Sequence, residues 1–105
     1  MPYFASLYNQ RTKTWTQREF KTITACRKAC YENIQNTDAY NIPITKSRTG
    51  RTVIGEVHTM YGYKGILYSC YIQPGHGLFY LGRDGVKGRM ITTNDNYKRK
   101  LYLMD

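Results

Sequence analysis

The sequence predicts an α+β fold, in which a single helix packs on a mostly antiparallel sheet of about seven strands. Only one segment has apolar residues at helical spacing, whereas most of the chain consists of short alternating segments separated by turn residues. A length of 105 residues with 41% hydrophobic content suits one small core, so residues 1–105 are expected to form a single basic domain. The predicted order is a β-hairpin, a helix and then about five strands.

The N-terminal segment is expected to form the β-hairpin. Residues 3–8 alternate weakly, so that their apolar side chains share one face of a strand. Residues 9–14 are polar and are typical of a turn. The extended pattern resumes over residues 15–21, which are rich in Thr and aromatic side chains.

A helix is expected to start near Thr22 or Thr24, because a Thr hydroxyl can accept an unpaired backbone N–H at a helix N-terminus. The apolar residues that follow are spaced by three, four and four positions, at Ile23, Cys26, Cys30 and Ile34. This spacing places them on one stripe of a helix of about three turns. Polar residues on its other faces are expected to meet solvent, namely Arg27, Lys28, Glu32 and Gln35.

The rest of the chain is expected to be β structure. Alternation is clearest over residues 66–72, where Tyr68 and Cys70 share an apolar face. Turn residues separate the segments at 48–51, 61–65, 73–77 and Asp84–Gly85. Strands are therefore expected at 42–46, 52–60, 66–72, 78–83 and 97–104, and residues 88–93 are expected to lead out of the last hairpin.

The charge balance predicts a polyanionic partner, either nucleic acid or an acidic protein surface. The chain has sixteen Lys and Arg residues and seven Asp and Glu residues, which gives a net charge of +9. It also has eleven Tyr residues. A positive field attracts polyanions, and cations on projecting turns can reach phosphates with little rearrangement. The expected anion-binding residues are Arg11, Lys13, Arg18, Lys46, Arg48, Arg51, Lys64, Arg83, Lys87, Arg89, Lys98, Arg99 and Lys100.

Two tyrosines are expected at a binding surface. Tyr61 and Tyr63 flank Gly62 in a predicted loop beside Lys64, where no alternation requires burial. Exposed rings next to a cation can stack on unpaired bases or anchor a protein interface. They can equally cover the edge of the core.

One pair of residues allows a catalytic hypothesis. Glu56 and His58 lie two positions apart on a predicted strand, so both side chains point to the same face. A carboxylate beside an imidazole suits general acid–base chemistry, and a nearby cation would complete a small ribonuclease. A surface pair without a special role explains the same spacing.

The three cysteines favour neither a disulfide framework nor a metal centre. Their number is odd, and Cys26 and Cys30 lie on the apolar helical stripe, where buried thiols behave as small apolar side chains. We expect no metal and no cofactor, and a reducing, cytoplasmic location. The N-terminus lacks the pattern of a secretory signal, and no window is apolar enough to span a membrane.

The first third of the chain resembles the arm-type DNA-binding domains of phage integrases. The resemblance rests on residues 4–14, 18–22 and 25–29, which follow a strand–strand–helix pattern. In that family a small sheet sits on the major groove and a helix packs behind it, so the resemblance implies DNA contact through a sheet face. The rest of the chain has no recombinase features.

Three functions are therefore expected, in this order. The first is a small non-enzymatic protein that binds nucleic acid through cationic hairpin turns and exposed tyrosines. The second is an inhibitor or adaptor of viral type, which binds an acidic surface of a host nucleic-acid-handling protein. The third is the ribonuclease built on Glu56 and His58. Open sheet edges would also allow a homodimer.

Overall fold

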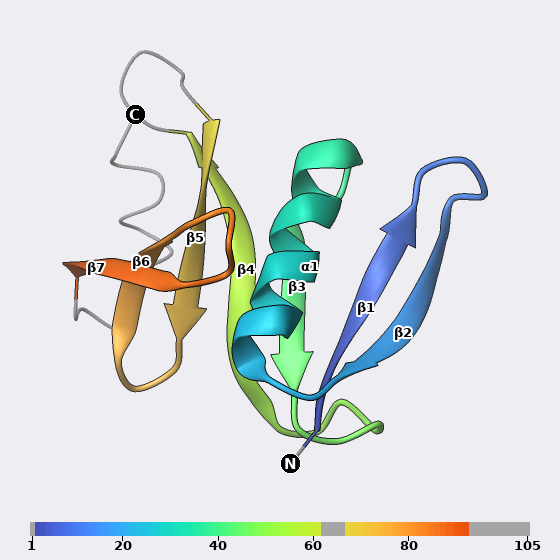
Figure 1. The fold of residues 1–105 in the computed structure, drawn as a ribbon, viewed down its shortest axis with the longest axis horizontal. Coiled ribbons are helices and arrows are strands. Elements are labelled where there is room, and N and C mark those ends of the chain that lie inside the picture. The colour runs from blue at the N-terminus through green and yellow to red at the C-terminus, as the bar shows by residue number, and fades with distance from the viewer. Residues whose placement is uncertain (1, 62–66, 93–105) are drawn as a thin grey trace.

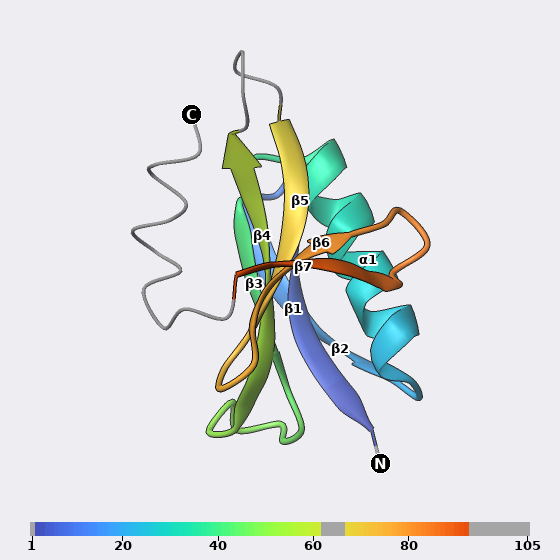
Figure 2. The same ribbon diagram turned by 90° about the vertical axis from the view of Figure 1, so that its left-hand side faces the viewer.

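The computed structural model of this protein describes residues 2–61 and 67–92. Within these residues, one sheet of seven antiparallel strands carries a single helix on one face, which confirms the predicted α+β fold (Figures 1 and 2). The elements in chain order are β1 (Tyr3–Asn9), β2 (Thr14–Phe20), α1 (Ile23–Asn36), β3 (Asn41–Thr45), β4 (Val53–Tyr61), β5 (Leu67–Gln73), β6 (Gly77–Leu81) and β7 (Lys87–Thr92).

The strand order is β2-β1-β3-β4-β5-β6-β7, so β1 lies between its hairpin partner and β3. The predicted hairpin is regular, with Tyr3 opposite Phe20 and Asn9 opposite Thr14. Because neighbouring strands are antiparallel, the start of each strand lies beside the end of the next one in the sheet. The β3–β4 and β5–β6 turns lie at the end where α1 begins, whereas the β1–β2 turn lies at the end where α1 finishes (Figure 1).

Helix α1 begins as its sequence predicts. Thr22 is the N-cap, and its side-chain oxygen accepts a hydrogen bond from the Ala25 N–H at 3.1 Å. The predicted apolar stripe faces the sheet, where Cys26, Cys30 and Ile34 are buried. The helix runs for 14 residues, about one turn longer than the stripe suggested.

Apolar side chains pack on both faces of the sheet. The larger cluster lies under the helix and joins its stripe to β1, β3, β4 and β5 through Ala5, Ile42, Ile44, Val57 and Tyr71. A smaller cluster, made of Cys70, Ile72 and Leu78 with Tyr68 against it, lies on the other face. The apolar face predicted for β5 is therefore confirmed, and it belongs to the smaller cluster, on the face of the sheet opposite the helix.

Two element boundaries differ from the sequence prediction. Strand β4 continues to Tyr61, which pairs with Leu67, although this residue was expected to begin a loop. Residues 87–92 form a full strand that pairs with β6. The predicted strand over 97–104 lies outside the described residues. None of the helices in the described part is long and apolar enough to cross a membrane.

The thiols of all three cysteines are buried and free of disulfide bonds. Burial raises the pKa of Cys70 to about 12, and the nearby Glu56 charge adds to this shift. The pKa of Cys30 is also raised, first by its hydrogen bond with Cys26 and then by burial. Raised pKa values keep these two thiols protonated, and burial hides all three from solvent.

We expect none of the three cysteines to react with a thiol reagent in the folded protein at neutral pH, because attack requires an accessible thiolate. A chromogenic disulfide reagent should report no fast-reacting thiol under native conditions. The same sample in denaturant should report three thiols per chain, which serves as the control. One thiol that reacts rapidly before unfolding would contradict the described packing.

Candidate anion-binding site

A pocket of about 490 Å³ lies between the start of helix α1 and the turns that follow β3 and β5. We call it the basic pocket. Its polar lining comes from six parts of the chain: β1, the helix, the β3–β4 connection, β5, the β5–β6 turn and β7. The side chains that give it hydrogen-bonding capacity are Tyr3, Arg27, Lys46, Tyr71, Gln73, His76 and Lys87.

Arg27 is held in place by contacts from two other elements. It projects from the first half of α1, one turn after Ile23, and both residues line the pocket. Its Nε donates a hydrogen bond to the Gly85 carbonyl in the β6–β7 turn at 2.8 Å. Its guanidinium carbon lies 5.0 Å from the centre of the Tyr71 ring, within cation–π range. The Arg27 side chain also hydrogen-bonds the Tyr71 side chain, and a guanidinium has five N–H donors, more than these two hydrogen bonds occupy.

Tyr71 forms the floor of the pocket beside Arg27. It is only 2% exposed, and its ring reaches across β4 at Gly55, where an added Cβ would overlap the hydroxyl group. Position 55 must therefore be glycine for the Tyr71 ring to occupy this place over β4. Burial raises the pKa of Tyr71, and the Arg27 charge partly offsets this, so the phenol stays a neutral donor near pH 7.

Lys87 is the second anchored cation. Its ammonium donates a hydrogen bond to the Gln73 side-chain oxygen at 2.8 Å and lies 4.3 Å from the centre of the Phe79 ring. Lys46 and His76 are freer: both are exposed, and they stand on the β3–β4 and β5–β6 turns. The pocket thus combines two fixed cations with two side chains that can move towards a ligand.

The electrostatics of the basic pocket favour an anion. Among the described residues that line it, three carry a permanent positive charge and none is acidic. The first turn of α1, which contributes Ile23 to the wall, also has no acidic residue. A helix N-terminus carries a partial positive charge and free N–H groups, which add to the field of the side chains.

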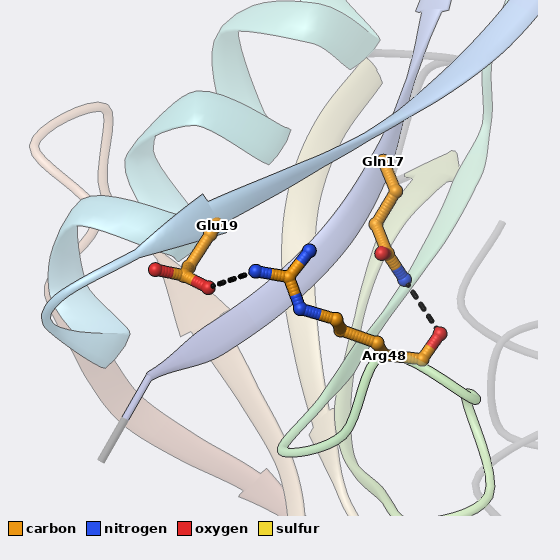
Figure 3. A network of polar contacts seen from close by, with 3 residues as sticks. All are labelled: Gln17, Glu19 and Arg48. Carbon is orange, nitrogen blue, oxygen red and sulfur yellow. Dashed lines mark hydrogen bonds and ion pairs between the residues drawn. The ribbon is translucent and has the colours of Figure 1, made fainter.

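Two of the predicted anion-binding residues, Lys46 and Lys87, meet in this pocket. Arg48 lies in the same β3–β4 connection but is already paired, since its guanidinium binds the Glu19 carboxylate at 3.0 Å and lies 5.3 Å from the Phe4 ring centre. Gln17 also donates to its carbonyl oxygen at 3.0 Å, so this connection is fastened to β2 (Figure 3). Arg51 is exposed near the end of the connection.

The other predicted cations do not join the basic pocket. Arg11 and Lys13 are exposed on the β1–β2 turn at the opposite end of the sheet (Figure 1). Arg18 covers the Phe20 ring, Arg89 lies 5.9 Å from the Tyr80 ring centre, and Arg83 is exposed on the β6–β7 turn. Further predicted site residues lie outside the described residues: Tyr63, Lys64, Lys98, Arg99, Lys100 and the side chain of Tyr61.

Glu56 and His58 do share the face of β4 that points away from the helix, as their spacing predicts. His58 contacts the Thr59 carbonyl through Nδ1 at 2.6 Å, and its ring meets the Tyr40 ring edge-on. Neither Glu56 nor His58 belongs to the described lining of the basic pocket. In the part of the chain that the structure describes, no three His, Cys, Asp or Glu side chains lie together as metal ligands.

Sequence reasoning missed Arg27, His76 and Tyr71 as members of the site. Arg27 was expected to face solvent, because it lies outside the apolar stripe. Arg27 lies four residues after Ile23, and residues at this spacing share a helix face. This spacing could have placed Arg27 at the edge of the contact between the helix and the sheet. Nothing in the sequence indicates that the turn containing His76 lies near the start of the helix.

Comparison with known proteins gives no match: no family model, no curated protein sequence and no solved structure resembles this chain significantly. The function must therefore be argued from the geometry of the site.

Gly85 → Ala should destabilise the protein by more than about 2 kcal/mol. The residue has φ +83°, which is unfavourable for alanine, and an added Cβ would clash with the Thr24 carbonyl and lie 2.7 Å from the Lys28 backbone nitrogen. The matched control is Gly50 → Ala, at φ +73° with open space around it, which should cost about 1 kcal/mol. Urea unfolding of both variants measures the difference. Equal losses would show that the β6–β7 turn does not pack tightly on the helix.

Proposed function

We propose that this protein binds nucleic acid and holds a backbone phosphate in the basic pocket. One observation carries the proposal: side chains from four separate segments, Arg27, Lys46, His76 and Lys87, line one pocket whose described lining has no acid. Like charges repel, so such a grouping is unfavourable unless an anion balances it. The pocket is therefore better explained as a ligand site than as ordinary surface charge.

The donor chemistry suits phosphate. An arginine fork can donate two parallel hydrogen bonds to phosphate oxygens, and lysines add compact positive charges from the side. The contacts that Arg27 makes with Gly85 and Tyr71 fix its position before binding, which reduces the entropy lost on binding. The neutral Tyr71 phenol can add a further donor.

Nucleic acid is favoured over a small anion because positive charge continues beyond the pocket. Lys21 precedes the helix cap, and Arg51 precedes β4, so both lie at the same end of the sheet and both are exposed. With a net charge of +9, the chain would attract a long polyanion strongly. The proposed role is binding rather than catalysis, because the described lining offers no carboxylate to act with His76 as an acid–base pair.

Affinity for a short single-stranded oligonucleotide should fall steeply as salt rises, with a slope of log K against log salt of roughly −0.7 for each phosphate contacted. Lys46 → Gln and Lys87 → Gln should each weaken binding and reduce the size of that slope by close to the value of one contact. Fluorescence anisotropy of a labelled strand at several salt concentrations gives both quantities.

The control variant is Arg83 → Gln, which removes the same charge from an exposed position outside the basic pocket. It should change affinity less than either lysine variant. Equal effects of all three changes would mean that net charge, not the pocket, governs binding. Affinity that does not depend on salt would contradict the proposal. Equal binding of polyglutamate would also contradict it and would favour an acidic protein surface as the partner.

A further inference from the structure

A second pocket, of about 330 Å³, lies at the end of the sheet opposite the basic pocket. We call it the aromatic pocket. Its lining comes from the end of β1, the start of β2, the segment between α1 and β3, and the first residue of β3. The residues that line it are Tyr8, Trp15, Asp38, Ala39, Tyr40 and Asn41.

Three rings give this pocket its stacking surface. Tyr8 and Trp15 are direct cross-strand partners, and their ring centres lie 4.9 Å apart at a tilt of 49°. Trp15 is 50% exposed and Tyr40 is 68% exposed, so large flat surfaces remain open to solvent. Exposed rings of this kind lose little entropy on binding and stack readily on planar ligands.

Two residues of the pocket supply hydrogen-bond acceptors, Asp38 and Asn41. Gln10 fixes Asp38 through two hydrogen bonds: its Nε2 donates to Oδ2 at 2.7 Å, and its Oε1 accepts from the Asp38 N–H at 2.8 Å. The carboxylate therefore has a set orientation. Asn41 adds a buried Oδ1 for which the described residues provide no hydrogen-bond donor. A complementary ligand is thus planar and carries N–H donors on its edge.

The neighbouring charges favour a nucleotide over an organic cation. Gln10 opens the β1–β2 turn, which also carries the exposed cations Arg11 and Lys13. These cations would repel an ammonium ligand, but they would attract the phosphate attached to a bound base. The turn and the aromatic pocket together match the two parts of a nucleotide.

Guanine fits the acceptors best among the bases. Its N1–H and its 2-amino group are adjacent donors on one edge, and one carboxylate can accept from both. Uracil has one N–H donor on the corresponding edge, and hypoxanthine lacks the 2-amino group. We infer that the aromatic pocket binds an unpaired guanine, which stacks on Trp15 and Tyr40 and donates to the Asp38 carboxylate. This inference extends the proposed function, since it adds base recognition to phosphate binding.

Trp15 is the only tryptophan in the chain, so its fluorescence reports on the aromatic pocket directly. The test is to titrate the full chain with GMP, IMP and UMP, which carry the same phosphate group. We expect GMP to quench Trp15 and to bind about tenfold more tightly than IMP, since a bidentate contact provides discrimination of this order. UMP should bind most weakly, because it has one N–H donor on this edge, as IMP has, and a smaller ring for stacking.

Asp38 → Asn is the matched variant, because its side chain can still accept from Gln10 while its charge is lost. Quenching should persist, but the preference for GMP over IMP should fall to about twofold or less. Tyr40 → Ala should weaken GMP and IMP alike, by roughly fivefold or more, through lost stacking. The nucleotide series on the unchanged protein tests the inference even if a variant does not fold.

Equal affinity for GMP, IMP and UMP, or an unchanged Trp15 signal, would overturn the inference. So would stronger quenching by choline than by GMP, which would assign the aromatic pocket to an organic cation. These outcomes are separate from failure of the proposed function, which is measured with a labelled strand that contains no guanine. That strand can bind through the basic pocket whether or not GMP quenches Trp15.

Discussion

The contact of Arg27 with Tyr71 and Gly85 is the interaction on which the basic pocket depends. It joins the helix to the centre of the sheet and to the turn that leads into β7. A hydrogen bond from a charged donor contributes about 1.5–3 kcal/mol, and a cation–π contact adds about 0.5–1 kcal/mol. Glycines make the contact feasible, because Gly55 leaves room for the Tyr71 ring and Gly85 lets the turn approach the helix backbone.

The antiparallel order of the sheet explains why two different sites arise from one small core. Antiparallel pairing puts the end of β3, the start of β4 and the end of β5 beside one another, so the β3–β4 and β5–β6 turns share one end with the helix cap. The β1–β2 turn and the segment after the helix share the other end. The pocket at the first end is lined by three cations, whereas the pocket at the second end is lined by aromatic rings and acceptors and has the cations Arg11 and Lys13 on the adjacent turn. Under the proposed function, a strand of nucleic acid would use both sites, because it offers both phosphates and bases.

Local patterns in the sequence predicted most of the fold. Alternation indicated the strands, the stripe from Ile23 to Ile34 indicated the helix, and Asp84–Gly85 indicated a tight turn. The site was predicted less well, because its members come together only through long-range pairing. The turns that carry Arg11 and Lys46 were both expected to bind anions, although the directions of the strands put these turns at opposite ends of the sheet. Tyr8, Trp15 and Tyr40 are likewise far apart in the chain but line one pocket.

The most direct test of the central claim is a chemical-shift map of the ¹⁵N-labelled protein during titration with a short single-stranded oligonucleotide. If folding unites these cations into a phosphate site, the largest amide shifts will come from the start of α1, the β3–β4 connection, the β5–β6 turn and the start of β7, around Arg27, Lys46, His76 and Lys87. Shifts of similar size around all exposed cations, with no larger shifts in these four segments, would contradict it.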